Sequence, residues 1–156
     1  MTSAFALAAG EGLTLPTPIG GDVTIKAGAS RTGGAMTVLE LHVPPKAGPA
    51  VHRHVREDEL WVVLDGEFRF QTGDDMLYAS TGGLAFGPRG LPHAFQNVGD
   101  EPGRLLIVTT PGGLEQFFEE AARLAAPVDP VVLAEVGRAT GVVFTGPPLG
   151  PPDPRP

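Results

Sequence analysis

Hydrophobic and polar residues alternate in short runs from about residue 22 to residue 109, and turn residues separate the runs. The runs are DVTIKA (22–27), AMTVLELHVP (35–44), ELWVVL (59–64), FRFQ (68–71), MLYAS (76–80), LAFGP (84–88), HAFQN (93–97) and RLLIVTT (104–110). A period of two is typical of β-strands, and short strands at regular spacing favour a sandwich or a small barrel. We therefore expect an all-β body over about residues 20–110.

Two dipeptides predict tight connections inside this body. Asp65-Gly66 lies between ELWVVL and EFRFQT, and an Asp-Gly pair between apolar runs is the strongest short-range signal of a hairpin. Gly73-Asp74 follows FRFQ and predicts a second hairpin. Both pairs suit the backbone angles of two-residue hairpin loops.

The C-terminal third has a different pattern. Residues 114–127 repeat apolar side chains at helical spacing, and a second short helix is expected at 130–140. Asp129 can cap that helix, Pro130 suits its first position and Gly141 can close it. We expect the two helices, about residues 113–140, to cover a barrel face or a subunit contact. Residues 142–146 predict one more strand, and the proline-rich tail, 147–156, is expected to be extended or disordered.

Composition narrows the class of protein. The 156 residues suit a single domain, 1–156, and the formal net charge of −7 argues against binding to nucleic acid or to an anionic membrane. The absence of cysteine excludes disulfides and thiolate ligands. No apolar run reaches the length of a membrane span, and the first residues lack the basic start of a signal peptide. We expect a cytoplasmic protein.

Three of the four histidines suggest a metal centre. His52 and His54 are two residues apart, so in a strand they project from the same face. Glu59 heads the next apolar run, and His93 comes much later, directly after Gly90-Leu91-Pro92. Three imidazoles and one carboxylate suit one divalent transition metal such as Fe, Mn, Co, Ni, Cu or Zn, rather than Ca or Mg.

Other residues compete for these roles. Glu57 and Asp58 could replace Glu59 if the strand began earlier, although we expect both to face solvent. His42 shares a strand face with Glu40 and is not one of the four candidate ligands. Each histidine taken alone is more often an ordinary hydrogen-bonded side chain than a ligand.

Four further residues are candidates to line a substrate pocket. Trp61 shares strand parity with Glu59, and Phe95 shares it with His93, so inward-facing ligands imply inward-facing aromatic rings. Met36 and Val38 are additional candidates on an alternating strand. Ligand pockets are mostly apolar, which these side chains would satisfy, although they could equally be plain core.

The spacing of the candidate ligands resembles the two motifs of the cupin superfamily. The first, G-x5-H-x-H-x(3,4)-E-x6-G, is matched from His52 through Glu59 to Gly66, but only three residues separate Gly48 from His52 where the motif has five. The second, G-x5-P-x-G-x2-H-x3-N, is matched at every fixed position. Those positions are Gly82, Pro88, Gly90, His93 and Asn97. Roughly residues 10–150 resemble small bacterial cupins labelled quercetin-2,3-dioxygenase-like.

This resemblance implies a double-stranded β-barrel, or jelly roll, and commonly a homodimer. It implies that His52, His54, Glu59 and His93 hold the metal, and that Glu59 also acts as a base towards a substrate hydroxyl. The implied activity is that of a metal-dependent oxidoreductase, a dioxygenase that joins dioxygen to an aromatic or enolic small molecule. Because the fold hosts many functions, two alternatives stay open: an isomerase, cyclase or lyase that uses the metal as a Lewis acid, and a non-catalytic binding protein.

Overall fold

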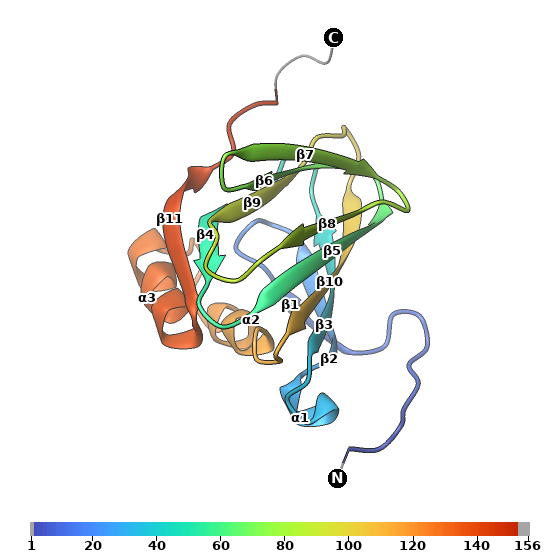
Figure 1. Cartoon of the computed structure of the whole chain (residues 1–156). Coiled ribbons are helices and arrows are strands. Elements are labelled where there is room, and N and C mark those ends of the chain that lie inside the picture. The colour runs from blue at the N-terminus through green and yellow to red at the C-terminus, as the bar shows by residue number, and fades with distance from the viewer. Residues whose placement is uncertain (1, 153–156) are drawn as a thin grey trace.

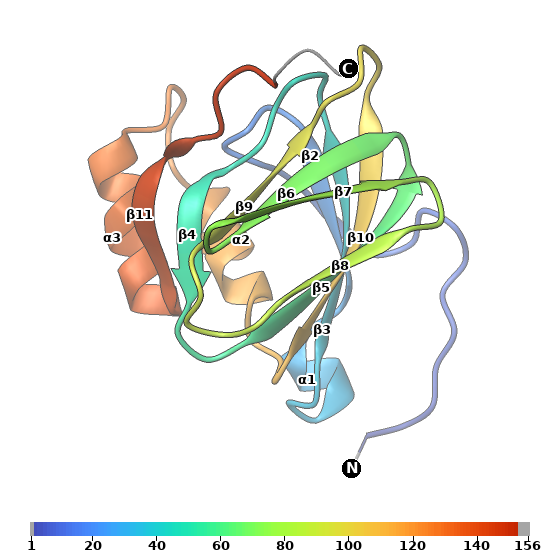
Figure 2. The ribbon, with the colours of Figure 1, turned by 45° about the horizontal axis from the view of Figure 1, so that its top comes forward.

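The computed structural model describes residues 2–152 and consists mainly of two antiparallel β-sheets that enclose a common core (Figures 1 and 2). The six-stranded sheet has the order β1 (Leu13–Pro16), β2 (Asp22–Ala27), β3 (Thr37–Val43), β10 (Gly103–Thr110), β5 (Asp58–Asp65) and β8 (Leu84–Gly87). The five-stranded sheet has the order β11 (Val142–Pro148), β4 (Ala50–His54), β9 (His93–Asn97), β6 (Glu67–Thr72) and β7 (Asp75–Ser80). The expected all-β jelly roll is confirmed.

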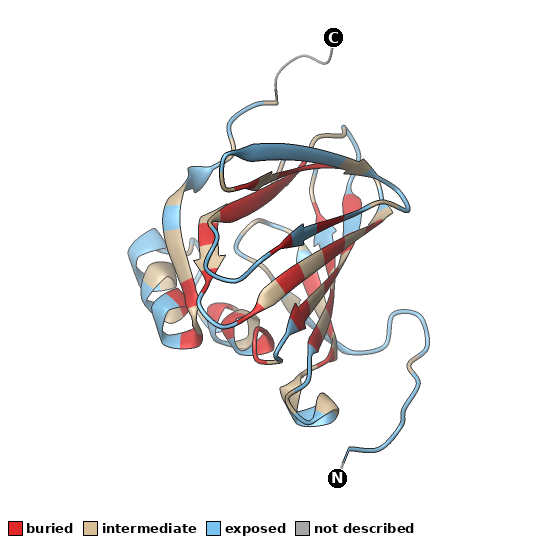
Figure 3. Cartoon of the chain, in the orientation of Figure 1, coloured by how far each residue is buried: buried red, intermediate tan, exposed pale blue. Residues whose placement is uncertain are grey.

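The core lies between the two sheets, and Figure 3 shows buried (red) residues in strands of both sheets. Strand β3 illustrates the cause, because its odd-numbered side chains are buried while the even-numbered ones are more exposed. Burial of each large apolar side chain contributes about 1.5–3 kcal/mol to folding. The largest apolar side chains that are fully buried in the core include Trp61, Phe68, Phe70, Leu39, Leu41, Leu105 and Ile107.

The connection at Asp65-Gly66 is not the predicted hairpin. Strand β5 pairs with β10 and β8, whereas β6 pairs with β7 and β9, so the chain passes from one sheet to the other at this point. Gly66 is the single residue between the strands and has a φ of 101°, which suits glycine. The dipeptide correctly marks a sharp turn, but long-range strand pairing decides which sheet the next strand joins. The second prediction is confirmed, because β6 and β7 pair across Gly73-Asp74 with Thr72 opposite Asp75.

The C-terminal helices lie next to β11 at one side of the barrel (Figures 1 and 2). Helix α3 (Pro130–Thr140) agrees with the prediction: the Asp129 side chain accepts a hydrogen bond from Val131 N at 2.8 Å, and Gly141 has a φ of 89°. Helix α2 (Glu115–Ala121) is shorter than the expected range 114–127. A proline disfavours the helical conformation only in the residue before it, here Ala126, so Pro127 does not explain why α2 already ends at Ala121.

The tail expected to be extended or disordered at 147–156 begins inside a strand, so its first residues are extended and ordered. Residues 147 and 148 belong to β11, and the Gly150 carbonyl accepts hydrogen bonds from Gln96 and Arg69. The side chains of β6 and β9 therefore hold the chain after the last strand. Residues 153–156 are outside the described part of the protein.

Strand β1 and the short helix α1 (Ala29–Thr32) were not predicted, because each has only four residues and no clear period. Helix α1 is tied to α2 through the buried Glu115 carboxylate, which accepts hydrogen bonds from Ala29 N at 2.7 Å and Gly113 N at 3.1 Å. Within residues 2–152, no helix has the length and apolar character needed to cross a membrane.

Candidate metal centre

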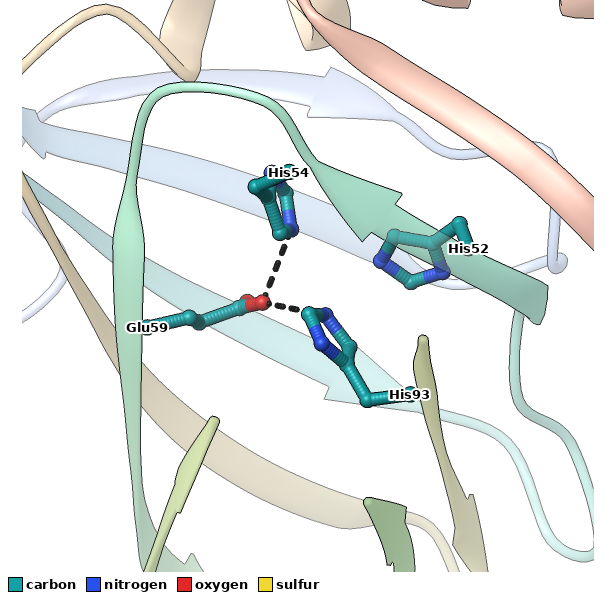
Figure 4. Close-up of side chains that lie close together, drawn as sticks. All are labelled: His52, His54, Glu59 and His93. Atoms are coloured by element: carbon teal, nitrogen blue, oxygen red, sulfur yellow. Dashed lines mark ion pairs between the residues drawn. The ribbon is translucent and has the colours of Figure 1, made fainter. Parts of the chain in front are cut away.

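The four predicted ligands meet inside the barrel, between the two sheets (Figure 4). His52 and His54 lie on β4, and His93 lies on the adjacent strand β9, directly opposite His52. Glu59 reaches the same point from β5 in the other sheet. All four residues are buried, and each offers a donor atom within 4.8 Å of the other three.

Glu59 is at the centre of the cluster. Its Oε2 atom lies 2.9 Å from His54 Nε2 and 3.0 Å from His93 Nε2, as the dashed lines in Figure 4 mark. The His52 ring packs against the other two imidazoles, with centroid distances of 5.1 Å to His54 and 4.6 Å to His93. One ion could therefore contact one atom of each residue.

The backbone orients two of the three imidazoles. The Nδ1 atom of His52 lies 2.8 Å from the Ala50 carbonyl oxygen, and that of His93 lies 3.1 Å from the Leu91 carbonyl oxygen. A carbonyl oxygen only accepts hydrogen bonds, so in both rings Nδ1 carries the hydrogen. The other nitrogen, Nε2, is then the lone-pair donor that a metal ligand needs.

The donor atoms themselves lack hydrogen-bond partners. Glu59 Oε2, His54 Nε2 and His93 Nε2 are buried, and none makes a hydrogen bond of acceptable geometry within the described residues. Buried polar atoms are nearly always satisfied, and each exception calls for an explanation. A divalent ion bound by nitrogen and oxygen atoms would satisfy all three atoms at once, so the residues fit a transition metal.

Burial and the charges of neighbouring side chains shift the pKa values of the residues in the cluster. Burial, reinforced by the neighbouring His93 and His54, lowers the pKa of His52 from 6.5 to about 3. Burial alone would lower the pKa of His54, but Glu59 and Glu57 raise it above 6.5. Burial would likewise raise the pKa of Glu59, yet His54 and His93 hold it well below its ordinary value. At neutral pH His52 is thus neutral and Glu59 is ionised.

The directions of these pKa shifts predict that metal binding releases a proton. Because its pKa is raised, His54 holds its proton to a higher pH than a free imidazole does, whereas His52, with a pKa of about 3, is neutral. A metal needs neutral imidazole, so binding near pH 6.5 should release a proton from His54, and the affinity should rise with pH. Calorimetry of Co²⁺ binding in buffers with different ionisation enthalpies measures this release. Binding that releases no proton would contradict the expected state of His54.

The competing candidates take other positions. Asp58 is partly exposed and pairs with Arg89 at 3.0 Å, so it is not a ligand. His42 is exposed on the outer face of β3, beside Glu40. Glu57, in contrast, is buried, which corrects the expectation that it faces solvent. Its side chain lies behind His54, with Glu57 Oε2 3.8 Å from His54 Nδ1.

The predicted pocket residues are only partly correct. A cavity of about 540 Å³ adjoins the cluster, and Phe95 lines it together with His52, His54 and Glu59. Met36 is 38% exposed, and neither it nor Val38 lines the cavity. The reason is strand parity: the buried face of β3 carries the odd-numbered residues. Trp61 is also absent from the cavity wall, because its ring packs against His93 with a centroid distance of 5.0 Å.

Most of the cavity wall comes from residues that sequence reasoning assigned to no site. The C-terminal elements contribute apolar side chains on α2, α3 and β11, which confirms that the helices cover a face of the barrel. The helical apolar spacing of residues 114–127 was the available signal, but it does not distinguish a cavity wall from ordinary core. These side chains are Leu114, Phe117, Phe118, Leu133, Val142 and Phe144.

Comparison with known proteins supports the same interpretation. Residues 39–109, which include all four candidate ligands, match the family model of the cupin domain. A search of curated proteins found no match to the chain. The solved structure of KdgF from Halomonas sp. aligns with a TM-score of 0.62 at 16% identity, over 70% of this chain and 94% of its own.

Two further solved structures have the same fold. A predicted oxalate decarboxylase from Thermotoga maritima aligns with a TM-score of 0.54 at 21% identity, over 58% of this chain and 80% of its own. A sugar phosphate isomerase from Silicibacter pomeroyi, described as from a cupin superfamily, aligns with a TM-score of 0.51 at 23% identity, over 60% of each chain. At such identities the likeness establishes the fold alone. The chain thus matches the cupin-domain model over residues 39–109 and has the same fold as these solved structures.

Proposed function

We propose that this protein is a metal-dependent oxidoreductase of the dioxygenase type that acts on an aromatic or enolic small molecule. The observation that carries the proposal is the buried cluster of three histidines and one glutamate beside a largely apolar cavity of about 540 Å³. This volume lies within the range of small-molecule sites, about 300–1,000 Å³. The resemblance of the two histidine motifs to those of quercetin-2,3-dioxygenase-like cupins supports the reaction type.

The cavity wall favours an apolar, aromatic substrate. Phenylalanine rings stand on β9, α2 and β11, and polar side chains such as Thr17, Lys46 and Gln96 are few outside the histidine cluster. A small dianion such as oxalate, or a sugar phosphate, would leave most of its polar atoms without partners against such walls. The cavity therefore argues for a different substrate class from those named for the two similar enzymes. The phenylalanines are Phe95, Phe117, Phe118 and Phe144.

The protein's own groups would bind and orient the substrate. A bound divalent ion supplies Lewis acidity, which lowers the pKa of a substrate hydroxyl placed against it. Glu59 is ionised at neutral pH and borders the cavity, so its carboxylate can accept that hydroxyl proton. The aromatic walls would hold the flat body of the substrate and exclude water.

The proposal is tested by metal analysis followed by oxygen uptake. The purified protein is loaded in turn with Fe, Mn, Co or Ni, its metal content is measured, and oxygen consumption is followed with a flavonol such as quercetin. We expect about one metal per chain and metal-dependent uptake. Glu59→Gln should lower turnover about 10²- to 10⁴-fold, the range for loss of a general base, while His42→Ala, a change outside the cluster, should not.

Two outcomes would contradict the proposal. Stoichiometric metal without oxygen uptake would exclude the flavonol reaction and favour an isomerase, cyclase or lyase, or a binding protein. No metal under any loading would exclude the centre itself. The homodimer implied by the resemblance stays a prediction, which light scattering of the purified protein measures.

A further inference from the structure

The third imidazole is held differently from the other two. His52 and His93 each direct Nδ1 to a backbone carbonyl two residues earlier in the chain. His54 Nδ1 is buried and has no hydrogen-bond partner within the described residues. The charged group nearest to it on that side is the Glu57 carboxylate, with Oε2 at 3.8 Å.

Glu57 is itself an unusual side chain. It lies in the loop between β4 and β5, is 2% exposed, and its Oε2 atom has no hydrogen-bond partner within the described residues. Its other oxygen lies 3.7 Å from Arg56 Nε, but the Arg56 side chain is 55% exposed, so water screens this pair. His54, Arg56 and hydrogen bonds from the Arg56 and Glu57 backbone favour its ionised form, but burial outweighs them and raises the pKa of the Glu57 carboxyl. Ionised Glu57 therefore carries a net cost in this fold.

We propose that Glu57 is a positioning residue, which accepts the Nδ1–H of His54 when the centre holds its metal and supplies the second negative charge of the site. This inference rests on the proposed metal centre. The distance of 3.8 Å exceeds a charge-assisted hydrogen bond of about 2.7–2.9 Å, so a small side-chain movement would close the contact. It would give His54 the same tautomer as the other two rings, with Nε2 facing the ion.

Charge balance supports the same role. A divalent ion held by three neutral imidazoles and Glu59 leaves one net positive charge inside an apolar barrel. The negative charge of the Glu57 carboxylate, hydrogen-bonded to the His54 ring, would make the centre neutral. A neutral centre avoids the cost of a net charge in surroundings of low dielectric constant. Carboxylates behind metal-bound histidines act in this way in many proteins, and their loss weakens metal binding about 10- to 100-fold.

The test compares metal affinity with the stability of the metal-free protein. Glu57→Gln keeps the shape but removes the charge, and Glu57→Leu removes both the charge and the acceptor. Asp58→Asn is the matched control, because it removes the same charge one residue away, at a partly exposed site. The probe is Co²⁺ alone, titrated into chelator-treated protein and followed by its visible absorption. The melting temperature of each metal-free variant is measured in parallel.

We expect the Kd for Co²⁺ to rise about 10- to 100-fold in Glu57→Gln and at least as much in Glu57→Leu. The metal-free variants should melt at the same temperature as the natural protein or higher, because they remove a buried charge whose desolvation outweighs its attraction to His54. A purely structural glutamate would not give this combination. Asp58→Asn should change the Kd by less than about threefold, as surface charges contribute little.

Three results would overturn the proposal. Unchanged Co²⁺ affinity in both variants would show that Glu57 does not support His54. Weaker binding together with a lower melting temperature of both metal-free variants would assign Glu57 a structural role instead. Failure of the natural protein to bind Co²⁺ would remove the metal centre as well, so this result is distinguishable from failure of Glu57 alone.

Discussion

Replacement of His93 by alanine should abolish stoichiometric metal binding, because it removes the one ligand that β9 contributes. The His93 Nε2 atom lies 3.0 Å from Glu59 Oε2 and is buried without a hydrogen-bond partner in the described structure. Loss of a residue that hydrogen-bonds to a metal ligand weakens metal binding by at most roughly 100-fold. Loss of a ligand itself should raise the Kd for Co²⁺ by more than this. Titration of chelator-treated protein, followed by Co²⁺ absorption, measures the change.

His42→Ala is the matched control for this experiment. It removes an imidazole from the exposed face of β3, outside the cluster, and should leave Co²⁺ binding unchanged. Because His93 packs against Trp61, His93→Gln provides a second variant that better preserves the packed volume. If both His93 variants bound Co²⁺ as tightly as the natural protein, the assignment of the centre would be wrong.

Replacement of Gly48 by alanine should be the most destabilising small change near the centre. A Cβ atom at this position would lie 2.0 Å from the Phe95 carbonyl oxygen and 3.1 Å from Gln96 Cα, both of which are backbone atoms of β9. A backbone contact cannot be relieved by a rotamer change, so the segment just before β4 would have to move away from β9. We expect a loss of about 3 kcal/mol, the upper part of the usual range for overpacking. For a chain of this size that lowers the melting temperature by about 6–12 °C.

The same variant should also weaken Co²⁺ binding, because β4 carries His52 and β9 carries His93 opposite it. Gly150→Ala is the control: it makes the same chemical change where no atom lies within 4 Å of the added carbon. Thermal unfolding followed by circular dichroism compares the two variants. An unchanged melting temperature for Gly48→Ala would show that the segment before β4 can move away from β9 without loss.

Gly48 also explains a departure from the first cupin motif. Three residues rather than five separate it from His52, so the motif alone assigns it no clear role. In the structure it permits the close approach of the chain before β4 to the backbone of β9. This contact joins segments that are far apart in the sequence, so the local sequence pattern could not predict it.

Three of the four candidate ligands, His52, His54 and Glu59, were predictable from residues close together in the chain. A spacing of two places His52 and His54 on one face of any strand, and strand parity places Glu59 inside once β5 begins at Asp58. The position of His93 could not be obtained from local patterning, and the second motif supplied it by resemblance. The structure then places His93 directly opposite His52.

Glu57 and the pocket residues show where such reasoning fails. Glu57 follows Arg56 and precedes Asp58 in a polar segment, which predicts exposure, yet the loop turns it behind His54. Val38 lies on β3 and Met36 comes just before it with the same parity, but which face of β3 is inward depends on pairing with β10 and β2. Solvent exposure in a loop and the inward face of a strand are both set by distant segments.

The sequence was enough to predict three features: the alternation of apolar residues, the caps of the helix at Asp129 and Gly141, and the shared face of His52 and His54. Each of them depends only on residues that are close together in the chain. The passage between sheets at Gly66, the close contact at Gly48 and the aromatic cavity wall depend on segments far apart in the chain. Their geometry arises only when the two sheets and the C-terminal helices pack together, because side-chain periodicity specifies a face but not its partner.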